Sequence, residues 1–234
     1  MDNLLRTIYK NIIAFLFPIK CLKCGRVGKW FCEDCAETLR PVAELHCLIC
    51  QRPALGGFTH VQCRTRNNPE RIICYFDFHE KVVSRAIHLL KYKGYVSLVS
   101  EITNLITSSL EENGVSFGEE AVIVPVPLHP VKKLLRGFNQ SELLANELAR
   151  SLGLEARSDL VERTRDTPSQ TGLKKQARKE NVDKAFSATD ENFIKGKDFI
   201  VFDDVYTTGA TILEVCRVLK KAGARYVYAM TFAH

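Results

Sequence analysis

From about residue 71 to its end, the chain alternates between short apolar stretches and longer amphipathic ones. The period of the apolar positions predicts strands over 71–79, 121–127, 198–204 and 226–232, and helices over 80–92, 96–113, 139–152 and 211–223. The stretch at 121–127 is almost wholly apolar, which is typical of a strand buried on both faces. The pattern therefore predicts an α/β fold with a parallel sheet flanked by helices.

The first twenty residues have a different pattern. Apolar residues recur there at helical spacing, at Leu4, Leu5, Ile8, Ile12, Phe15 and Leu16, which predicts an amphipathic helix over 1–20 docked on the body of the protein. The apolar run within it is too short to span a bilayer, and no small-residue cleavage site follows it. We therefore expect no membrane insertion, and attachment to a membrane surface is the alternative.

Residues 21–70 are marked by cysteine pairs. Seven of the nine cysteines lie between Cys21 and Cys63, mostly as Cys-x-x-Cys, the spacing of zinc knuckles. Sequential pairing predicts one site from Cys21, Cys24, Cys32 and Cys35, and a second from Cys47, Cys50, His60 and Cys63. Cys74 is the alternative to His60 as fourth ligand. We expect one or two zinc ions.

Four protein ligands leave no open coordination position, so the predicted zinc is structural. Reduced thiols indicate a cytoplasmic protein. The formal net charge of +6 is modest, and residues 1–70 hold ten Lys and Arg against six Asp and Glu. Such a basic module either touches nucleic acid or braces a neighbouring domain, and composition does not decide between the two.

The stretch FIVFDDVYTTGATI, residues 199–212, joins a predicted strand to a predicted helix. Ligands bind at this end of parallel strands, and loop amides at a helix N-terminus suit a phosphate. The predicted phosphate loop consists of Tyr206, Thr207, Thr208, Gly209, Ala210 and Thr211. Asp203 and Asp204 would repel phosphate, but they suit vicinal sugar hydroxyls or a Mg²⁺ held by them. A ribose 5-phosphate meets both requirements.

This stretch resembles the 5-phosphoribosyl-1-pyrophosphate (PRPP) loop of type I phosphoribosyltransferases. The cysteine pairs, LKYKG at 90–94, PVPLHPVKKLLRGFNQSELLA from 125 and RTRDTPSQTGLKKQARKENVDKAF from 163 extend the likeness to the ComF family of competence-associated proteins. His60 departs from the pattern, since relatives commonly have a cysteine there. The resemblance implies a zinc-ribbon module over 21–70 and a type I phosphoribosyltransferase-like domain over 71–234.

The resemblance also implies roles for individual residues. Asp203, Asp204 and Arg136 would serve PRPP chemistry with Mg²⁺. Lys91 and Lys93 would receive pyrophosphate, although both also suit a solvated helix end. The polar segment 163–186 resembles the mobile region of these folds, which Arg178 and Asn181 would anchor.

Two functions follow from the resemblance. The first is a PRPP-binding protein of DNA uptake in natural transformation, which handles incoming single-stranded DNA together with a competence helicase or other DNA-uptake proteins. Tyr92, Tyr95 and Phe138 would then stack bases, although aromatic residues near a sheet more often pack into it. The alternative is an active transferase that moves ribose 5-phosphate from PRPP to a nitrogenous base or amine. The sequence offers no obvious general base for it.

Overall fold

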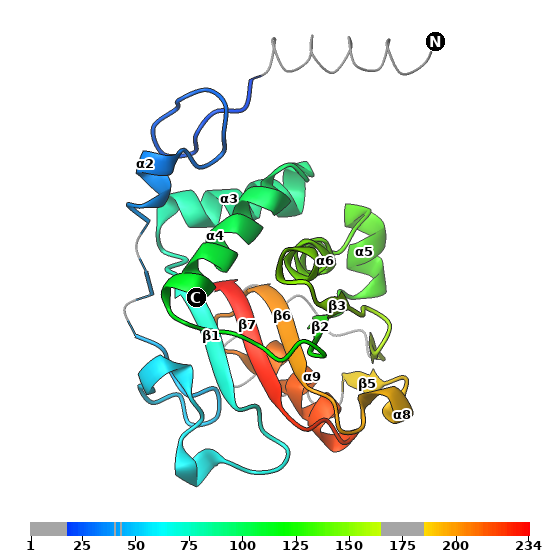
Figure 1. The fold of residues 1–234 in the computed structure, drawn as a ribbon. Coiled ribbons are helices and arrows are strands. Elements are labelled where there is room, and N and C mark those ends of the chain that lie inside the picture. The colour runs from blue at the N-terminus through cyan, green and yellow to red at the C-terminus, as the bar shows by residue number, and fades with distance from the viewer. Residues whose placement is uncertain (1–17, 40, 43, 165–184) are drawn as a thin grey trace.

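The computed structural model describes residues 18–39, 41–42, 44–164 and 185–234 (Figure 1). The amphipathic helix predicted over 1–20 falls almost entirely outside these residues. Arg178 and Asn181, predicted to anchor a mobile segment, also lie outside them. Among the described residues, no helix is both long and apolar enough to cross a membrane.

The core of the fold is a parallel five-stranded sheet with the order β1-β7-β6-β2-β3. Its strands are β1 (Arg71–Phe76), β7 (Val227–Ala233), β6 (Phe199–Val205), β2 (Val122–Pro125) and β3 (Glu155–Ala156). All four predicted strands are present, although β1 ends three residues earlier than expected. The prediction of a parallel α/β sheet is confirmed.

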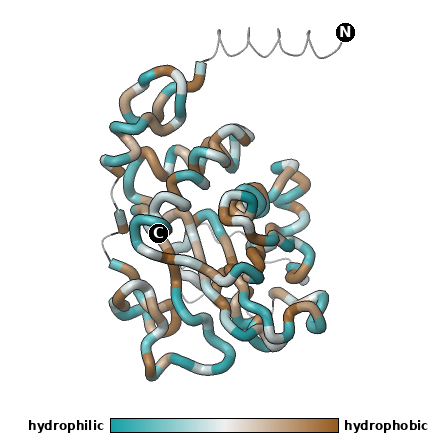
Figure 2. Tube along the Cα trace, in the orientation of Figure 1, coloured by the Kyte–Doolittle hydropathy of each residue, from teal (hydrophilic) through white to brown (hydrophobic). Residues whose placement is uncertain are grey.

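Helices cover both faces of the sheet (Figure 1). One face packs against α3 (Lys81–Lys93), α4 (Leu98–Glu112) and α6 (Gln140–Leu152); the other packs against α9 (Ala210–Lys221). Alternate residues of β6 divide between the two cores: Ile200 and Phe202 join the first, whereas Phe199 and Val201 join the second. In Figure 2 apolar residues (brown) gather in the strands at the centre of the fold, where both faces of the sheet are covered.

Several short elements were not predicted. They are α5 (Pro130–Arg136), α8 (Glu191–Ile194), strand β3 and an antiparallel pair of β4 (Val161–Arg163) with β5 (Phe186–Ala188). Helix α5 buries none of its residues and therefore has no apolar period to reveal it. Its remaining signals are Pro130 in the first turn and a cap at His129, whose ring accepts the Val131 amide at 3.2 Å.

The two cysteine segments dock on opposite faces of the sheet. The first contains α2 (Glu33–Ala36), and its Leu22, Trp30 and Phe31 join the core under α3 and α4. The second contains short 3₁₀ turns at Leu55–Gly57 and Val61–Cys63, and its Leu48 joins the core under α9. Because both halves share a core with the sheet, a division of the chain near residue 70 stays a prediction.

One carboxylate fixes the first cysteine segment to the sheet domain. Glu101 of α4 accepts the Trp30 amide at 2.9 Å and the Phe31 amide at 2.7 Å. The Trp30 indole adds a hydrogen bond to Ser97 at 3.1 Å. These bonds satisfy backbone donors that the packing of Trp30 and Phe31 removes from water.

We expect Glu101→Ala to lower the free energy of unfolding by roughly 1–3 kcal/mol, because two amides lose a charged acceptor. Urea denaturation of the zinc-loaded protein measures this loss. Glu111→Ala is the matched control, since Glu111 lies exposed on the last turn of the same helix. Equal midpoints for the two variants would contradict the assignment.

Candidate functional site

Two groups of sulfur and nitrogen atoms have the arrangement of metal sites. They are Cys21, Cys24, Cys32 and Cys35, and Cys47, Cys50, His60 and Cys63; within each group all ligand atoms lie within 4.8 Å of one another. Tetrahedral zinc with bonds of about 2.3 Å requires ligand atoms less than about 4 Å apart, which small movements achieve from this arrangement. Both groups could hold zinc, in the pairing that the sequence predicted.

The two segments repeat the same knuckle. Gly25 donates its amide to Cys21 O at 2.9 Å, and Gln51 donates to Cys47 O at the same distance. Both residues have positive φ, 79° and 59°, which is unusual for Gln51 because it has a side chain. The repeat places matching apolar residues, Leu22 and Leu48, after the first cysteine of each knuckle.

Backbone amides point at the sulfurs of the leading cysteines. Burial raises the pKa of the Cys21 thiol, but the amides directed at its sulfur, chiefly those of Cys24 and Cys32, outweigh this and lower the pKa to about 6. Cys47 follows the same pattern, with its pKa lowered despite burial. Stabilised thiolates are the form in which cysteine binds zinc.

The second group includes His60 and leaves out Cys74. His60 Nε2 lies 2.9 Å from Pro53 O, a group that only accepts, so Nε2 carries the proton. The lone pair is then on Nδ1, which faces Cys50 Sγ at 3.2 Å. Such an outer hydrogen bond orients histidine ligands in zinc proteins. Cys74 is buried within β1 and points its thiol at Phe76 O.

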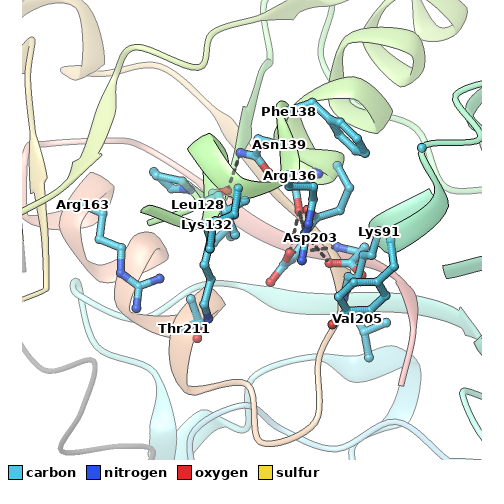
Figure 3. A pocket seen from close by; sticks show the side chains of 18 of the residues that line it. Lys91, Leu128, Lys132, Arg136, Phe138, Asn139, Arg163, Asp203, Val205 and Thr211 are labelled. Carbon is cyan, nitrogen blue, oxygen red and sulfur yellow. Dashed lines mark hydrogen bonds and ion pairs between the residues drawn. The ribbon is translucent and has the colours of Figure 1, made fainter. Parts of the chain in front are cut away.

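A cavity of about 710 Å³ opens at the carboxyl ends of β6 and β2. Figure 3 shows Asp203 near its centre, between Lys91 on one side and Lys132, Arg163 and Thr211 on the other. The end of α3, helix α5 and the start of α6 supply the rest of the wall. The cavity thus joins the end of the Asp-Asp strand to two basic segments, the end of α3 and helix α5.

Asp204 is buried, with 3% of its surface exposed, and it has a cation and a hydrogen-bond donor as partners. Lys91 forms an ion pair with Oδ2, and Gln140 Nε2 donates to Oδ1 at 3.1 Å. Burial by itself would raise the pKa of Asp204, but Lys91 and the hydrogen bonds outweigh it and hold the pKa below the usual value. The same ion pair raises the pKa of Lys91 against the effect of burial.

Asp203 is partly buried and faces the cavity. Its Oδ1 accepts the Ser141 hydroxyl at 2.7 Å and the Asp204 amide at 2.9 Å. Burial and the neighbouring Asp204 carboxylate raise the pKa of Asp203 to about 7, although Ser141 and Lys91 oppose the shift. The two aspartates therefore differ: Asp204 is fixed by its cation, whereas Asp203 gains or loses its proton near neutral pH.

Arg136, the last residue of α5, also lines the cavity. Its guanidinium donates to Gln140 Oε1 and lies 5.4 Å from the ring centroid of Tyr92. Asn139 caps α6 by accepting the Ser141 amide at 3.2 Å. Arg136 and Gln140 thus connect the exposed surface of α3 to the buried Asp204.

The predicted phosphate loop surrounds a cavity of about 90 Å³, lined by residues 203 and 205–212. Gly209 is the N-cap of α9 with φ of 71°, and it offers no side chain to cap the first turn. The amides of that turn and the helix dipole favour an anion there. Tyr206 lines the cavity, but its buried ring packs edge-on against the His234 ring, with the ring centroids 4.0 Å apart.

Most of the residues predicted for the site meet at this end of the sheet. Asp203, Asp204, Arg136, Lys91, Lys93 and Thr211 all line the larger cavity. Lys91 already forms an ion pair with Asp204. The two residues are 113 positions apart in the sequence, so no local pattern predicts this pairing. Sequence reasoning missed Lys132, Arg163, Gln140 and Ser141, which line the same cavity.

The family match and the similar proteins agree with each other. Residues 139–234 match the family described as the phosphoribosyl transferase domain. The chain is 32% identical over 210 residues to the DNA utilization protein YhgH of Escherichia coli K12, covering 86% of this chain and 89% of the relative. It is 26% identical to competence protein ComFC of Bacillus subtilis, over 82% of this chain and 78% of that protein.

Among solved structures, the allosteric regulatory enzyme of purine biosynthesis aligns with a TM-score of 0.38 and 21% identity. The alignment covers 57% of this chain but only 26% of that enzyme.

The raised pKa of Asp203 predicts a pH-dependent stability. Its folded pKa of about 7 exceeds the ordinary value of 3.8, so the folded protein gains from this proton at low pH and loses the gain as the pH rises from about 4 to 7. Asp203→Asn removes that loss. We expect the variant to be more stable than the wild type at pH 8, by about 1 kcal/mol or more, and the difference to shrink towards pH 4.

Denaturation midpoints in Mg²⁺-free buffer measure this difference. Asp204→Asn is the control with the opposite sign, because it leaves Lys91 buried without its carboxylate and should cost about 3 kcal/mol at pH 8. If the denaturation midpoints of Asp203→Asn and the wild type changed in parallel between pH 5 and 8, the raised pKa of Asp203 would be contradicted.

Proposed function

Because the chain belongs to the ComF family, we propose that it is a PRPP-binding protein of the phosphoribosyltransferase family that handles incoming single-stranded DNA during DNA uptake. The observation that carries the proposal is the cavity at the carboxyl ends of β6 and β2, where a phosphate loop, an aspartate pair and a basic, aromatic rim meet. The relatives named for DNA utilization and competence support a role in DNA uptake.

In this proposal PRPP lies along the carboxyl end of β6. The 5-phosphate binds at residues 206–211, where the loop has space and the N-terminus of α9 favours an anion. Asp203 accepts the ribose hydroxyls or a Mg²⁺ bound to them, while the ion pair with Lys91 holds Asp204 behind it. Lys93 and Arg136, with the charge of Lys91 nearby, face the pyrophosphate.

We propose that both cysteine groups hold structural zinc. Each group supplies four ligand atoms, which fills a tetrahedral site. Each knuckle is too short to bury a core of its own, and its apolar residues instead join the cores of the sheet. The cytoplasm is the compartment we propose, because its reducing conditions keep thiols available for zinc.

The rim of the cavity suits single-stranded DNA. Tyr92 exposes 65% of its surface beside Arg136, and Phe138, Lys93 and Lys132 line the same mouth. Aromatic faces stack bases and cations follow the phosphates, without regard to sequence. A competence helicase or another DNA-uptake protein is the partner expected to supply the strand.

We favour PRPP as a ligand over PRPP as a substrate. A transferase needs a group that takes the proton of the incoming nitrogen. In the described part of the cavity wall the carboxylates are Asp203 and Asp204. Asp204 is paired with Lys91, and Asp203 is the group that the ribose would occupy. An active transferase therefore remains the second candidate.

We predict two zinc ions per chain and one in His60→Ala, because that change removes one of four ligands from the second site. His60→Cys should restore the second ion, since a thiolate can replace the imidazole. Metal analysis after gel filtration gives both counts. His88→Ala, a change of an exposed histidine on α3, is the control that should retain two. Two ions in His60→Ala would contradict the ligand assignment.

We predict that Tyr92→Ala and Arg136→Ala each weaken binding of a fluorescent oligothymidine by about 1–3 kcal/mol, with PRPP absent. Arg136→Ala should also reduce the salt slope by about 0.7, the contribution of one phosphate contact on a single strand. Fluorescence anisotropy at several salt concentrations measures both.

Two variants at distant positions control for the loss of a positive charge and the loss of an aromatic ring. Arg150 lies in the last turn of α6, away from the cavity at its start, and Tyr226 precedes β7 at the opposite end of the sheet. Arg150→Ala and Tyr226→Ala should bind oligothymidine as the wild type does. Losses as large as those of the cavity variants would place the strand elsewhere.

A further inference from the structure

The second cysteine knuckle is in direct contact with the phosphate loop. Leu48 lies between Cys47 and Cys50 and exposes only 3% of its surface. A Cβ atom built on Gly209 would lie 2.7 Å from Leu48 Cδ2, closer than side-chain packing permits. The Leu48 methyl group thus occupies the space beside the N-cap of α9, and Gly209 is the residue that allows this approach.

A series of aromatic rings also links the loop to the residue before the knuckle. Tyr206, the first residue of the loop, is buried and packs edge-on against His234, with ring centroids 4.0 Å apart. His234 stacks in turn on His46, the residue before Cys47, at 6.3 Å. The knuckle therefore contacts the loop directly through Leu48 at Gly209, and the residue before it, His46, is linked to Tyr206 through His234.

We propose that the second knuckle positions the phosphate loop, with Leu48 as the positioning residue, and that metal in this knuckle and phosphate in the loop stabilise each other. The inference rests on the proposed function in that it takes the loop as a site for the PRPP phosphate. Coupling of this kind is reciprocal, because each ligand favours the same arrangement of the shared contact.

The first knuckle provides the comparison. Leu22 occupies the position equivalent to Leu48, but it packs into the core under α3 and α4 with Trp30 and Phe31. Leu48 packs into the core under α9, which includes Tyr206 and Ile212. A metal ion in the first knuckle therefore orders residues on the opposite face of the sheet from the loop, and we expect no coupling there.

The decisive variant pair is Leu48→Ala and Leu22→Ala, both checked for two bound zinc ions. Hydrogen exchange of residues 206–212, measured without PRPP, should become faster in Leu48→Ala and stay at the wild-type rate in Leu22→Ala. The Kd for Mg·PRPP should rise about 10-fold in Leu48→Ala, within the usual range of coupling between sites, and change little in Leu22→Ala.

The two readouts separate the inference from the proposed function. Faster exchange in Leu48→Ala supports the positioning role even if the wild type fails to bind PRPP, a failure that would count against the proposed function alone. Unchanged exchange of residues 206–212 in a zinc-loaded Leu48→Ala overturns the inference, whatever PRPP does.

A measurement on the wild-type protein guards against a variant that does not fold. Release of the two zinc ions to a coloured chelator should occur in two phases, which His60→Cys assigns by changing only the second-site phase. Saturating inorganic phosphate, the probe of the loop alone, should slow the second-site phase several-fold. Equal slowing of both phases, or of neither, would overturn the reciprocal coupling.

Discussion

The burial of Asp204 is the constraint on which the site depends. A carboxylate removed from water must be paired, and Lys91 supplies the cation while Gln140 supplies a hydrogen bond. These partners come from α3 and α6, so the pairing fixes two helices against β6. Asp203, one residue earlier, is thereby held at the cavity with its carboxylate available. Pairing of the inner aspartate thus leaves the outer one for a ligand.

The cysteine segments extend this arrangement to both faces of the sheet. The first is attached to α4 through Glu101 and shares a core with α3, the helix whose last turn carries Lys91 and Lys93. The second is packed through Leu48 against the N-terminus of α9 and the phosphate loop. Each knuckle therefore packs against different elements of the site, the first against α3 and α4 and the second against α9. A zinc ion in either knuckle would act on the cavity through these packing contacts, because four protein ligands leave it no open position.

The parts predictable from sequence were those with a local signal. The sheet, its four main helices, both cysteine groups and the Asp-Asp loop follow from period or spacing within a few residues. Helix α5 buries nothing and the β4–β5 pair is very short, so neither has a period. The engagement of Lys91 by Asp204 and the contact of Leu48 with Gly209 join distant segments. Such contacts depend on the packed sheet and have no counterpart in the local pattern.

Calorimetric titration of Mg·PRPP into the zinc-loaded protein, followed by assay of the same solution for pyrophosphate, tests the central claim most directly. The account predicts saturable binding of one PRPP per chain, loss of binding in the Asp203→Asn, Asp204→Asn double variant, and PRPP recovered intact. Absence of binding would contradict the assignment of the cavity. Pyrophosphate released above the level of the double variant would contradict the ligand role and establish an enzyme.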